Sequence, residues 1–434
     1  MSNDGDARRR TRLPSCRLVD GISRRVRALT LSLLMVSACD CEASETAEQR
    51  ASPMGEAVEQ EPVRDEALIA EGRELVLHFQ CNRCHVIEGI DAPPASQRCV
   101  GCHQDIRSGE FSAEAEDLAR WTLHIRGLTD SPTLVSVGPR LRPEWLAAFL
   151  LDPQDLRPGL EAMMPRLAIE ADQAAAIAAF LTRDAAALGE PPAEDHVVRG
   201  RRLFDERGCR ACHAFSDAEA PERAERADTG SDTESGAGLA PNLDVTRDRF
   251  VRENITAWIQ HPSHMKSDTV MPELGLSGED AEALASYILF AELAPPSPPA
   301  LVPQLPMLTR EVLFAEVDER VFHRICRHCH ADGDFALGDG GPGNDGGFGF
   351  EGRGLNLTNY EGMAAGLLVD GRRESVFAVD ESGMPRLVRA LRARQLEEAG
   401  LRDPDVRGMP LGHPALSAED LQLVATWVSQ GRRR

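Results

Sequence analysis

The pattern Cys-x-x-Cys-His occurs four times in this 434-residue chain and limits its possible folds more than any other feature. The first motif is Cys81-Asn-Arg-Cys84-His85, the second Cys99-Val-Gly-Cys102-His103, the third Cys209-Arg-Ala-Cys212-His213 and the fourth Cys326-Arg-His-Cys329-His330. Of the chain's cysteines, only Cys16, Cys39 and Cys41 lie outside these motifs. The cysteines are therefore arranged as pairs, and each pair has a histidine at the same position.

Each pair has the spacing of a covalent haem site. Two thiols three positions apart on one turn can bond to the two vinyl groups of one haem, and the next histidine can bind the iron as proximal ligand. A zinc ribbon is the main alternative, because Cys84 and Cys99 enclose fourteen residues. A zinc ribbon needs no histidine after each pair, however, and would leave the third and fourth motifs without partners. The motifs therefore predict four covalently bound haem c groups, with His85, His103, His213 and His330 as proximal iron ligands.

The sequence around the motifs is repeated. Gly72 lies nine residues before Cys81, and Gly200 lies nine residues before Cys209. Further along the chain, Pro132-Thr-Leu corresponds to Pro241-Asn-Leu, and Met164-Pro corresponds to Met271-Pro. An amphipathic helical pattern follows each of these methionines. Residues 68–185 and 196–294 are therefore two copies of one arrangement, here called the first and second segments.

This order resembles the class I cytochrome c family, in which a helix, the motif, a Pro-Leu loop, a helix, Met-Pro and a last helix follow one another. In that family the first and last helices cross, and the methionine is the sixth iron ligand. The resemblance implies an all-α fold of three tandem cytochrome c-like domains, with Met164 and Met271 as distal ligands. The third segment, 310–431, is more divergent, but its end resembles that of the second. Met409 is the predicted distal ligand there, and Met384 is its competitor.

The second motif is an insertion in the first segment. From His85 to Pro132 is 47 positions, whereas from His213 to Pro241 is 28 positions. The extra residues contain the whole second motif, so the insertion adds a haem to one domain. The first segment is predicted to bind two haems and has one Met-Pro.

The second motif therefore needs another distal ligand. His124 lies in the inserted region and is the predicted ligand, and His78, before the first motif, is the alternative. Met164 is assigned to the first motif because Pro93 and Pro94 argue against a helix directly before Cys99. The spacing from Cys99 to Met164 is nevertheless the closer match to the second segment, so the opposite pairing stays open.

The N-terminus has the features of a bacterial export signal. Eight arginines lie within residues 8–27, and an apolar run ends at Ala38. That run is too short to span a bilayer, which needs about 20 residues. Val36-Ser-Ala-Cys39 resembles the lipobox of bacterial lipoproteins, in which the cysteine becomes the lipid-modified N-terminus. We therefore expect a signal peptide at 1–38 and lipidation of Cys39, although an ordinary signal peptide would share the first two features.

Three other stretches are predicted to connect or cover the helical segments. Residues 39–67 are acidic and poor in large apolar side chains, which predicts a flexible tether. Residues 295–309 are rich in proline, which predicts a stiff linker between the second and third segments. The glycine-rich residues 333–354 are predicted to form a solvent-exposed loop.

The charge limits the choice of partner. A net charge of −22 argues against nucleic acid, which needs a basic face, and favours redox proteins with a basic docking face. Saturated His/Met iron leaves no position for a small-molecule substrate. We expect a periplasmic electron carrier of the bacterial cell envelope, lipid-anchored to a membrane and placed between respiratory redox partners. The alternative is a haem-containing subunit of an oxidase, peroxidase or dehydrogenase with an open site at the Cys99/Cys102 haem.

Overall fold

Helices dominate the structure and account for 48% of it. The computed structural model describes residues 65–122, 125, 131–154, 156–157, 164–218, 239–295, 300–333, 341–381 and 383–434. All of them belong to one unit, Pro62–Arg434. The expectation of a mainly helical fold is confirmed. Within the described ranges, no helix is both long enough and apolar enough to cross a membrane.

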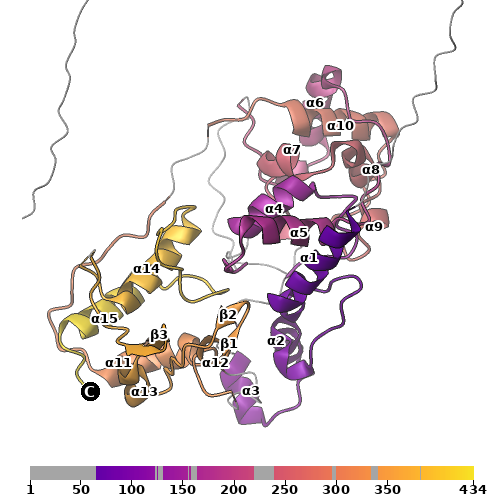
Figure 1. Ribbon diagram of the computed structural model, residues 1–434. Coiled ribbons are helices and arrows are strands. Elements are labelled where there is room, and N and C mark those ends of the chain that lie inside the picture. Colours follow the sequence, from indigo (N-terminus) through magenta and orange to yellow (C-terminus); the bar gives the residue numbers. More distant parts are fainter. Residues whose placement is uncertain are drawn as a thin grey trace, which may run out of the picture. The chain divides into compact units, whose positions relative to one another are not determined.

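The first segment is built around two helices that cross at a glycine. Its helices are α1 (Glu66–His78), α2 (Cys99–Ser108), α3 (Ala115–Thr122), α4 (Pro143–Leu151) and α5 (Ala171–Leu181). Helices α1 and α5 pack side by side (Figure 1). A Cβ on Gly72 of α1 would lie 1.9 Å from the carbonyl oxygen of Ala176 in α5. The absence of a side chain at Gly72 therefore allows the two backbones to touch.

The second segment has the same crossing. Its helices are α6 (Val197–Glu206), α7 (Thr246–Arg249), α8 (Ile255–Gln260), α9 (Pro262–Met265) and α10 (Gly278–Phe290). A Cβ on Gly200 of α6 would lie 1.9 Å from the carbonyl oxygen of Ala283 in α10. Helix α10 begins at a side-chain cap, because the Ser277 hydroxyl accepts a hydrogen bond from the N–H of Asp280 at 3.2 Å.

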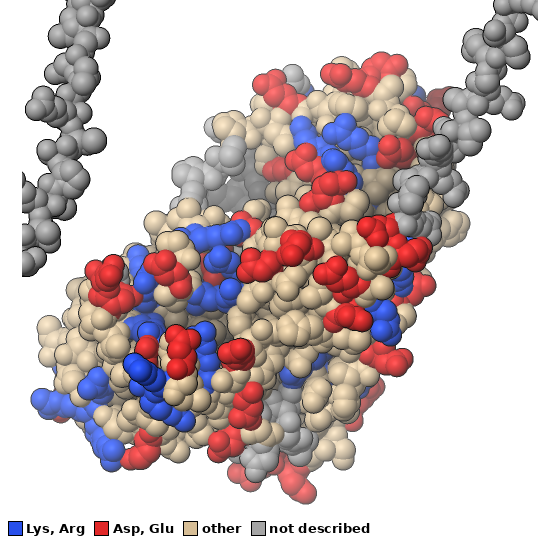
Figure 2. Space-filling model, viewed as in Figure 1, with Lys and Arg blue, Asp and Glu red and all other residues tan. Residues whose placement is uncertain are grey.

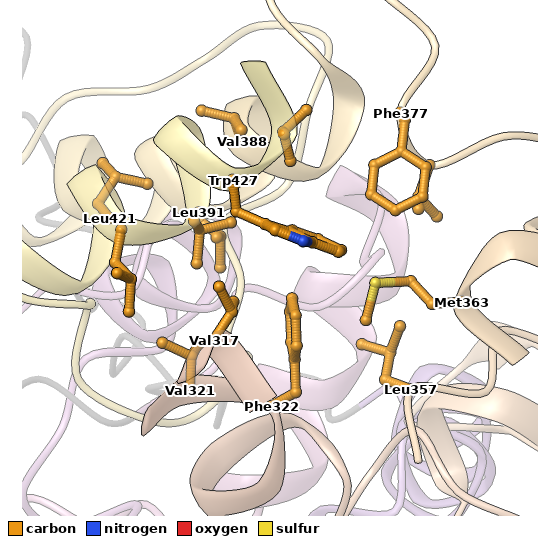
Figure 3. Packing of buried hydrophobic residues seen from close by; sticks show 14 of the residues in the cluster. Val317, Val321, Phe322, Leu357, Met363, Phe377, Val388, Leu391, Leu421 and Trp427 are labelled. Atoms are coloured by element: carbon orange, nitrogen blue, oxygen red, sulfur yellow. The ribbon is translucent and has the colours of Figure 1, made fainter. Parts of the chain in front are cut away.

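The third segment packs around Trp427. Its helices are α11 (Phe314–Val317), a π-helix (Asp318–Cys326), α12 (Pro342–Asp345), α13 (Tyr360–Ala365), α14 (Arg386–Glu398) and α15 (Ala418–Ser429). The buried indole of Trp427 lies edge-on to Phe322 and Phe377, with ring centroids 6.0 and 5.7 Å away (Figure 3). Val317 stands nine positions before Cys326, where the other two segments have the crossing glycine. The helices of this segment therefore contact each other through side chains, whereas the helix backbones touch in the other two segments.

Two short hairpins in the third segment add strands to the expected all-α fold. They pair β1 (Gly346–Gly347) with β2 (Phe350–Glu351) and β3 (Leu367–Val369) with β4 (Arg372–Glu374), both antiparallel. The prediction of a solvent loop at 333–354 is therefore wrong for residues 341–354. Phe348 and Phe350 of the first hairpin pack against the hydrophobic core of the first segment. Aromatic side chains bury too much apolar surface to stay in a solvated loop.

Hydrogen bonds join the segments. The side-chain amide of Asn254 in the second segment donates to the carbonyls of Pro139 and Ala186 in the first, at 2.7 and 2.6 Å. The N–H of Phe348 in the third segment donates to the side chain of Gln80 in the first at 3.2 Å. The first segment therefore contacts both of the others, and these contacts determine which motifs become neighbours.

Candidate haem sites

Three of the four motifs have the same backbone turn. The N–H groups of His85, His213 and His330 each donate to the carbonyl of the first cysteine of their motif, at 2.9 Å in every case. In the first and third motifs, a left-handed residue (Gln80 or Gly208) ends the preceding helix and starts this turn. The turn therefore presents both thiols and the histidine from one short, rigid piece of backbone. The second motif differs, because its residues form the first turn and a half of helix α2.

The histidines of the first and third motifs are held in one orientation by the loops that the repeat identified. The Nδ1 atom of His85 lies 2.8 Å from the carbonyl oxygen of Pro132, and that of His213 lies 2.9 Å from that of Pro241. A carbonyl accepts only from a protonated nitrogen, so the proton is on Nδ1 and the lone pair of Nε2 is available to a metal. Burial lowers the pKa of both histidines, which favours the neutral, metal-binding form.

In the fourth motif a leucine takes the place of this proline. The buried Nδ1 of His330 makes no well-formed hydrogen bond, although the backbone of Leu355 and Gly343 lies against it. The loop Leu355-Asn-Leu357 corresponds to Pro241-Asn-Leu243, since in both the asparagine side chain accepts from the N–H two residues on. This loop has no proline, so the Pro-Leu pattern of the other two segments does not reveal it in the sequence. The shared Asn-Leu pair was the signal that could have found it.

The first and third motifs open into one cavity of about 1520 Å³. Cys81, His85 and Met164 line it from the first segment, and Cys209, His213 and Met271 line it from the second. A pocket for one small molecule usually measures about 300–1,000 Å³, so this space suits two bulky groups. Each half offers a thiol, an oriented histidine and a methionine among apolar walls. The residues therefore fit two haems, which the thiols, histidines and methionines of the two halves would hold.

Buried and half-buried arginines lie on the wall of the same cavity. Burial, together with the neighbouring Arg140 and Arg157, lowers the pKa of Arg249 to about 10. The Arg249 guanidinium lies 5.3 Å from the ring centre of Trp145, and its buried Nε atom makes no hydrogen bond. Arg140 donates to the carbonyls of Ser136 and Val135, and Asp268 and Asp184 face it. A buried positive charge of this kind suits an anionic group such as a haem propionate.

The second motif lies against the first. The thiol of Cys84 makes a hydrogen bond with that of Cys99, and this contact is the main reason why the pKa of Cys84 is raised. The Nε atom of Arg83 donates to the carbonyl of Gln97 at 2.9 Å, which ties the first motif to the residues before the second. The second motif is therefore fixed directly beside the first, as its place in the sequence suggested.

The second motif also faces the fourth. A small cavity of about 50 Å³ is lined by Cys99 and His103 of the second motif, by His328 and Cys329 of the fourth, and by His413. The ring centres of His103 and His328 are 6.4 Å apart. Burial is the main reason why the pKa of His413 is lowered to about 4. The nearby positive charges of His103, His328 and Arg394 act in the same direction. Sequence reasoning assigned no role to His328 or His413.

The remaining predicted residues are in less defined positions. Met409 and Met384 both pack, partly buried, against the core of the third segment. His78 is exposed at the end of α1. His124 and Cys39 lie outside the described residues, as does the predicted signal peptide. Among the described cysteines, all eight motif thiols are free of disulfide bonds.

Comparison with known proteins places one part of the chain in a family. The family model for cytochrome c matches residues 197–291, which run from the start of α6 to just beyond α10. The chain is also 34% identical over 100 residues to cytochrome c oxidase subunit 2 of Alkalihalophilus pseudofirmus. That match covers 23% of this chain and 27% of the length of the relative. No solved structure matches. Residues 197–291 are therefore a cytochrome c domain, which implies covalently bound haem c and electron transfer through its iron.

Proposed function

We propose that the chain is a tetrahaem c-type cytochrome that carries electrons between respiratory partners in the bacterial cell envelope. The cavity shared by the first and third motifs is the main support. A carrier with several haems needs them close together, and this cavity has room and ligands for two. Each bound haem would supply one-electron chemistry at its iron. The thiols, oriented histidines and methionines of the chain would hold it and exclude water.

The contacts between motifs support a continuous series of four sites. The third motif shares a cavity with the first, the first contacts the second through Cys84 and Cys99, and the second faces the fourth through His103 and His328. The spatial order, 3-1-2-4, differs from the order in the sequence. Under this proposal the two ends of the series, at the third and fourth motifs, are the places where redox partners dock.

The repeated architecture supports three cytochrome c-like domains at 68–185, 196–294 and 310–431. The glycine crossing and the carbonyl-bound histidine of the cytochrome c domain recur in the first segment. The third segment also has the motif turn and a last helix capped by Ser417. It has other residues at the positions of the crossing glycine and of the proline whose carbonyl contacts the histidine. Under this proposal, the first two domains follow the cytochrome c pattern closely, and the third is a divergent copy of it.

The proposal includes a lipid anchor at Cys39, a tether at 39–67 and partners with a basic docking face. The net charge of −22 supports the last point. On the face that Figure 2 shows, Lys and Arg side chains gather over the third segment, and a further group of them lies over the second segment among acidic side chains.

Mass spectrometry and a potentiometric titration of the purified full-length protein test this proposal together. We expect a chain that begins at Cys39 and carries one lipid and four haems, all of which are reduced and oxidised reversibly. Fewer than four haems would contradict the tetrahaem assignment. A chain that retains residues 1–38 or has no lipid would contradict the anchor alone.

A haem-containing subunit of an oxidase, peroxidase or dehydrogenase is the second candidate, and the similarity to cytochrome c oxidase subunit 2 favours it. The two functions differ in whether one iron is open. A carrier with saturated iron should show no fast spectral change when the reduced protein meets carbon monoxide. Rapid binding at one haem would support the enzyme and contradict the carrier.

A further inference from the structure

The second motif needs a sixth iron ligand, and among the described residues of the first segment none but His103 itself brings a histidine or methionine to the cavity at this motif. Met164, which belongs to the segment's one Met-Pro, lines the large cavity together with His85 of the first motif. The small cavity at the second motif is lined by Arg83, Cys84 and Pro165 of the first segment and also by residues of the third segment, two of which are histidines, His328 and His413. The missing ligand is therefore to be sought across the contact between these two segments.

The spacing of two imidazole rings fits one iron between them. A histidine nitrogen lies about 2 Å from a bound metal ion, and the ring centre is about 1 Å beyond, so two axial imidazoles have centres about 6 Å apart. The ring centres of His103 and His328 are 6.4 Å apart, with an angle of 47° between the planes. We propose that His328 is the sixth ligand of the iron held by the second motif, opposite His103.

The backbone around His328 gives it a fixed position. His328 lies between Cys326 and Cys329, and the N–H groups of Cys329 and His330 both donate to the carbonyl of Cys326, at 3.3 and 2.9 Å. One turn thus carries the thiols and His330 for its own haem and His328 for the neighbouring one. His413, in contrast, lies in an irregular stretch before α15.

The contact between the first and third segments holds His328 near the second motif without help from a haem. Arg83 of the first motif lies 5.0 Å from the ring centre of Phe348, whose N–H donates to Gln80. Elsewhere on the same contact, Arg407 donates to the carbonyl of Arg166 at 2.9 Å. Side-chain interactions therefore connect residues on both sides of the second motif's cavity. These interactions hold His103 and His328 close to each other.

A second histidine ligand would give this haem properties unlike those of the other three. Ligation by two histidines lowers the reduction potential relative to His/Met, since a thioether favours the reduced iron. The site in the middle of the series would then have the lowest potential. This inference rests on the proposed function, because it requires a haem at the second motif.

Three matched variants of the full-length, haem-loaded protein test the assignment. His328→Ala should retain four haems by mass, convert one haem from low spin to high spin in electron paramagnetic resonance, and bind one carbon monoxide per protein. His413→Ala is the control from the same cavity, and His124→Ala tests the ligand predicted from the sequence. Both should leave four low-spin haems that do not bind carbon monoxide.

Each other outcome has a defined meaning. Four low-spin haems in His328→Ala, or a new high-spin haem in either of the other two variants, would overturn the assignment to His328. Fewer than four haems in the unsubstituted protein would instead contradict the tetrahaem function. His328→Met distinguishes loss of the ligand from a folding defect. This variant should keep four low-spin haems and raise the reduction potential of one of them. Four unchanged potentials in that variant would also overturn the assignment.

Discussion

Gly200 in α6 lies directly against the carbonyl group of Ala283 in α10, and a Cβ at this position would meet the oxygen at 1.9 Å. Gly72 and Ala176 have the same relationship in the first segment. In each of these two segments, the crossing holds the helix before the Cys-x-x-Cys-His motif against the last helix of the segment. In the third segment, Val317 stands at the corresponding position and the helix before the motif widens into a π-helix. The glycine therefore determines how closely the two helices approach.

Gly200→Ala should destabilise the second segment strongly. The new methyl group would force apart two helix backbones, which cannot move as a flexible side chain can, and overpacking of this kind costs about 1–3 kcal/mol or more. Urea unfolding followed by circular dichroism measures the loss. Gly278→Ala, at the start of α10, is the control, because a Cβ there would meet no atom within 4 Å. Equal stability of the two variants would contradict the role of the crossing.

The sequence was a good guide within each segment. The positions of Gly72 and Gly200 before their motifs reflect a backbone crossing, and the positions of Pro132 and Pro241 reflect a carbonyl that orients the histidine. These features could be predicted because each depends on local spacing that is repeated along the chain. Leu355 shows the limit of this approach, because the backbone of any residue can lie beside the histidine where the other two segments have proline.

The contacts between segments could not be predicted in this way. Phe348 and Arg83 are far apart in the chain, and no periodic pattern connects them. The same is true of His328, whose place within the fourth motif suggested no link to His103. Only the folded chain brings these pairs together, so the spatial order of the motifs was not accessible from the sequence.

Met271→Ala should remove the weak far-red absorption band of one methionine-bound haem and lower the potential of that haem. The reason is that the thioether favours reduced iron. Met265→Leu is the control, because Met265 is buried in the core at α9 and such a swap usually costs less than about 1.5 kcal/mol. Optical spectra during a potentiometric titration provide both measurements. An unchanged band in Met271→Ala would show that another residue binds this iron.

Asp403→Asn should weaken the third segment near neutral pH. Both carboxylate oxygens of Asp403 bind Arg389, at 2.7 and 2.8 Å, and Arg389 holds the pKa of Asp403 below its usual value. A lowered folded-state pKa adds stability that is fully present above the unfolded pKa of about 4 and is lost as pH falls through the lower folded value. The melting temperature of Asp403→Asn should therefore be several degrees lower at pH 7, and the difference should shrink below pH 4.

Asp405→Asn is the matched control for this pair. Asp405 also contacts Arg389, at 2.9 Å, but its side chain is 72% exposed, and exposed ion pairs contribute little. We expect almost no change in its melting temperature at either pH. If the two variants behaved alike, the bidentate contact of Asp403 would not be the source of the stability.

Arg249→Gln should lower the potentials of the two haems in the shared cavity. Arg249 lies half-buried beside Arg140 and Arg157 on the cavity wall, so a haem bound there would leave its positive charge poorly screened. A positive charge stabilises the added electron, and its loss should shift the potentials down by on the order of tens of millivolts. Arg252→Gln, an exposed position close by in the sequence, removes the same charge in solvent and should shift neither potential. A downward shift confined to two of the four haems would locate the charge at the cavity that the first and third motifs share. A shift spread evenly over all four would mean that the net charge of the protein, and not the position of Arg249, sets the potentials.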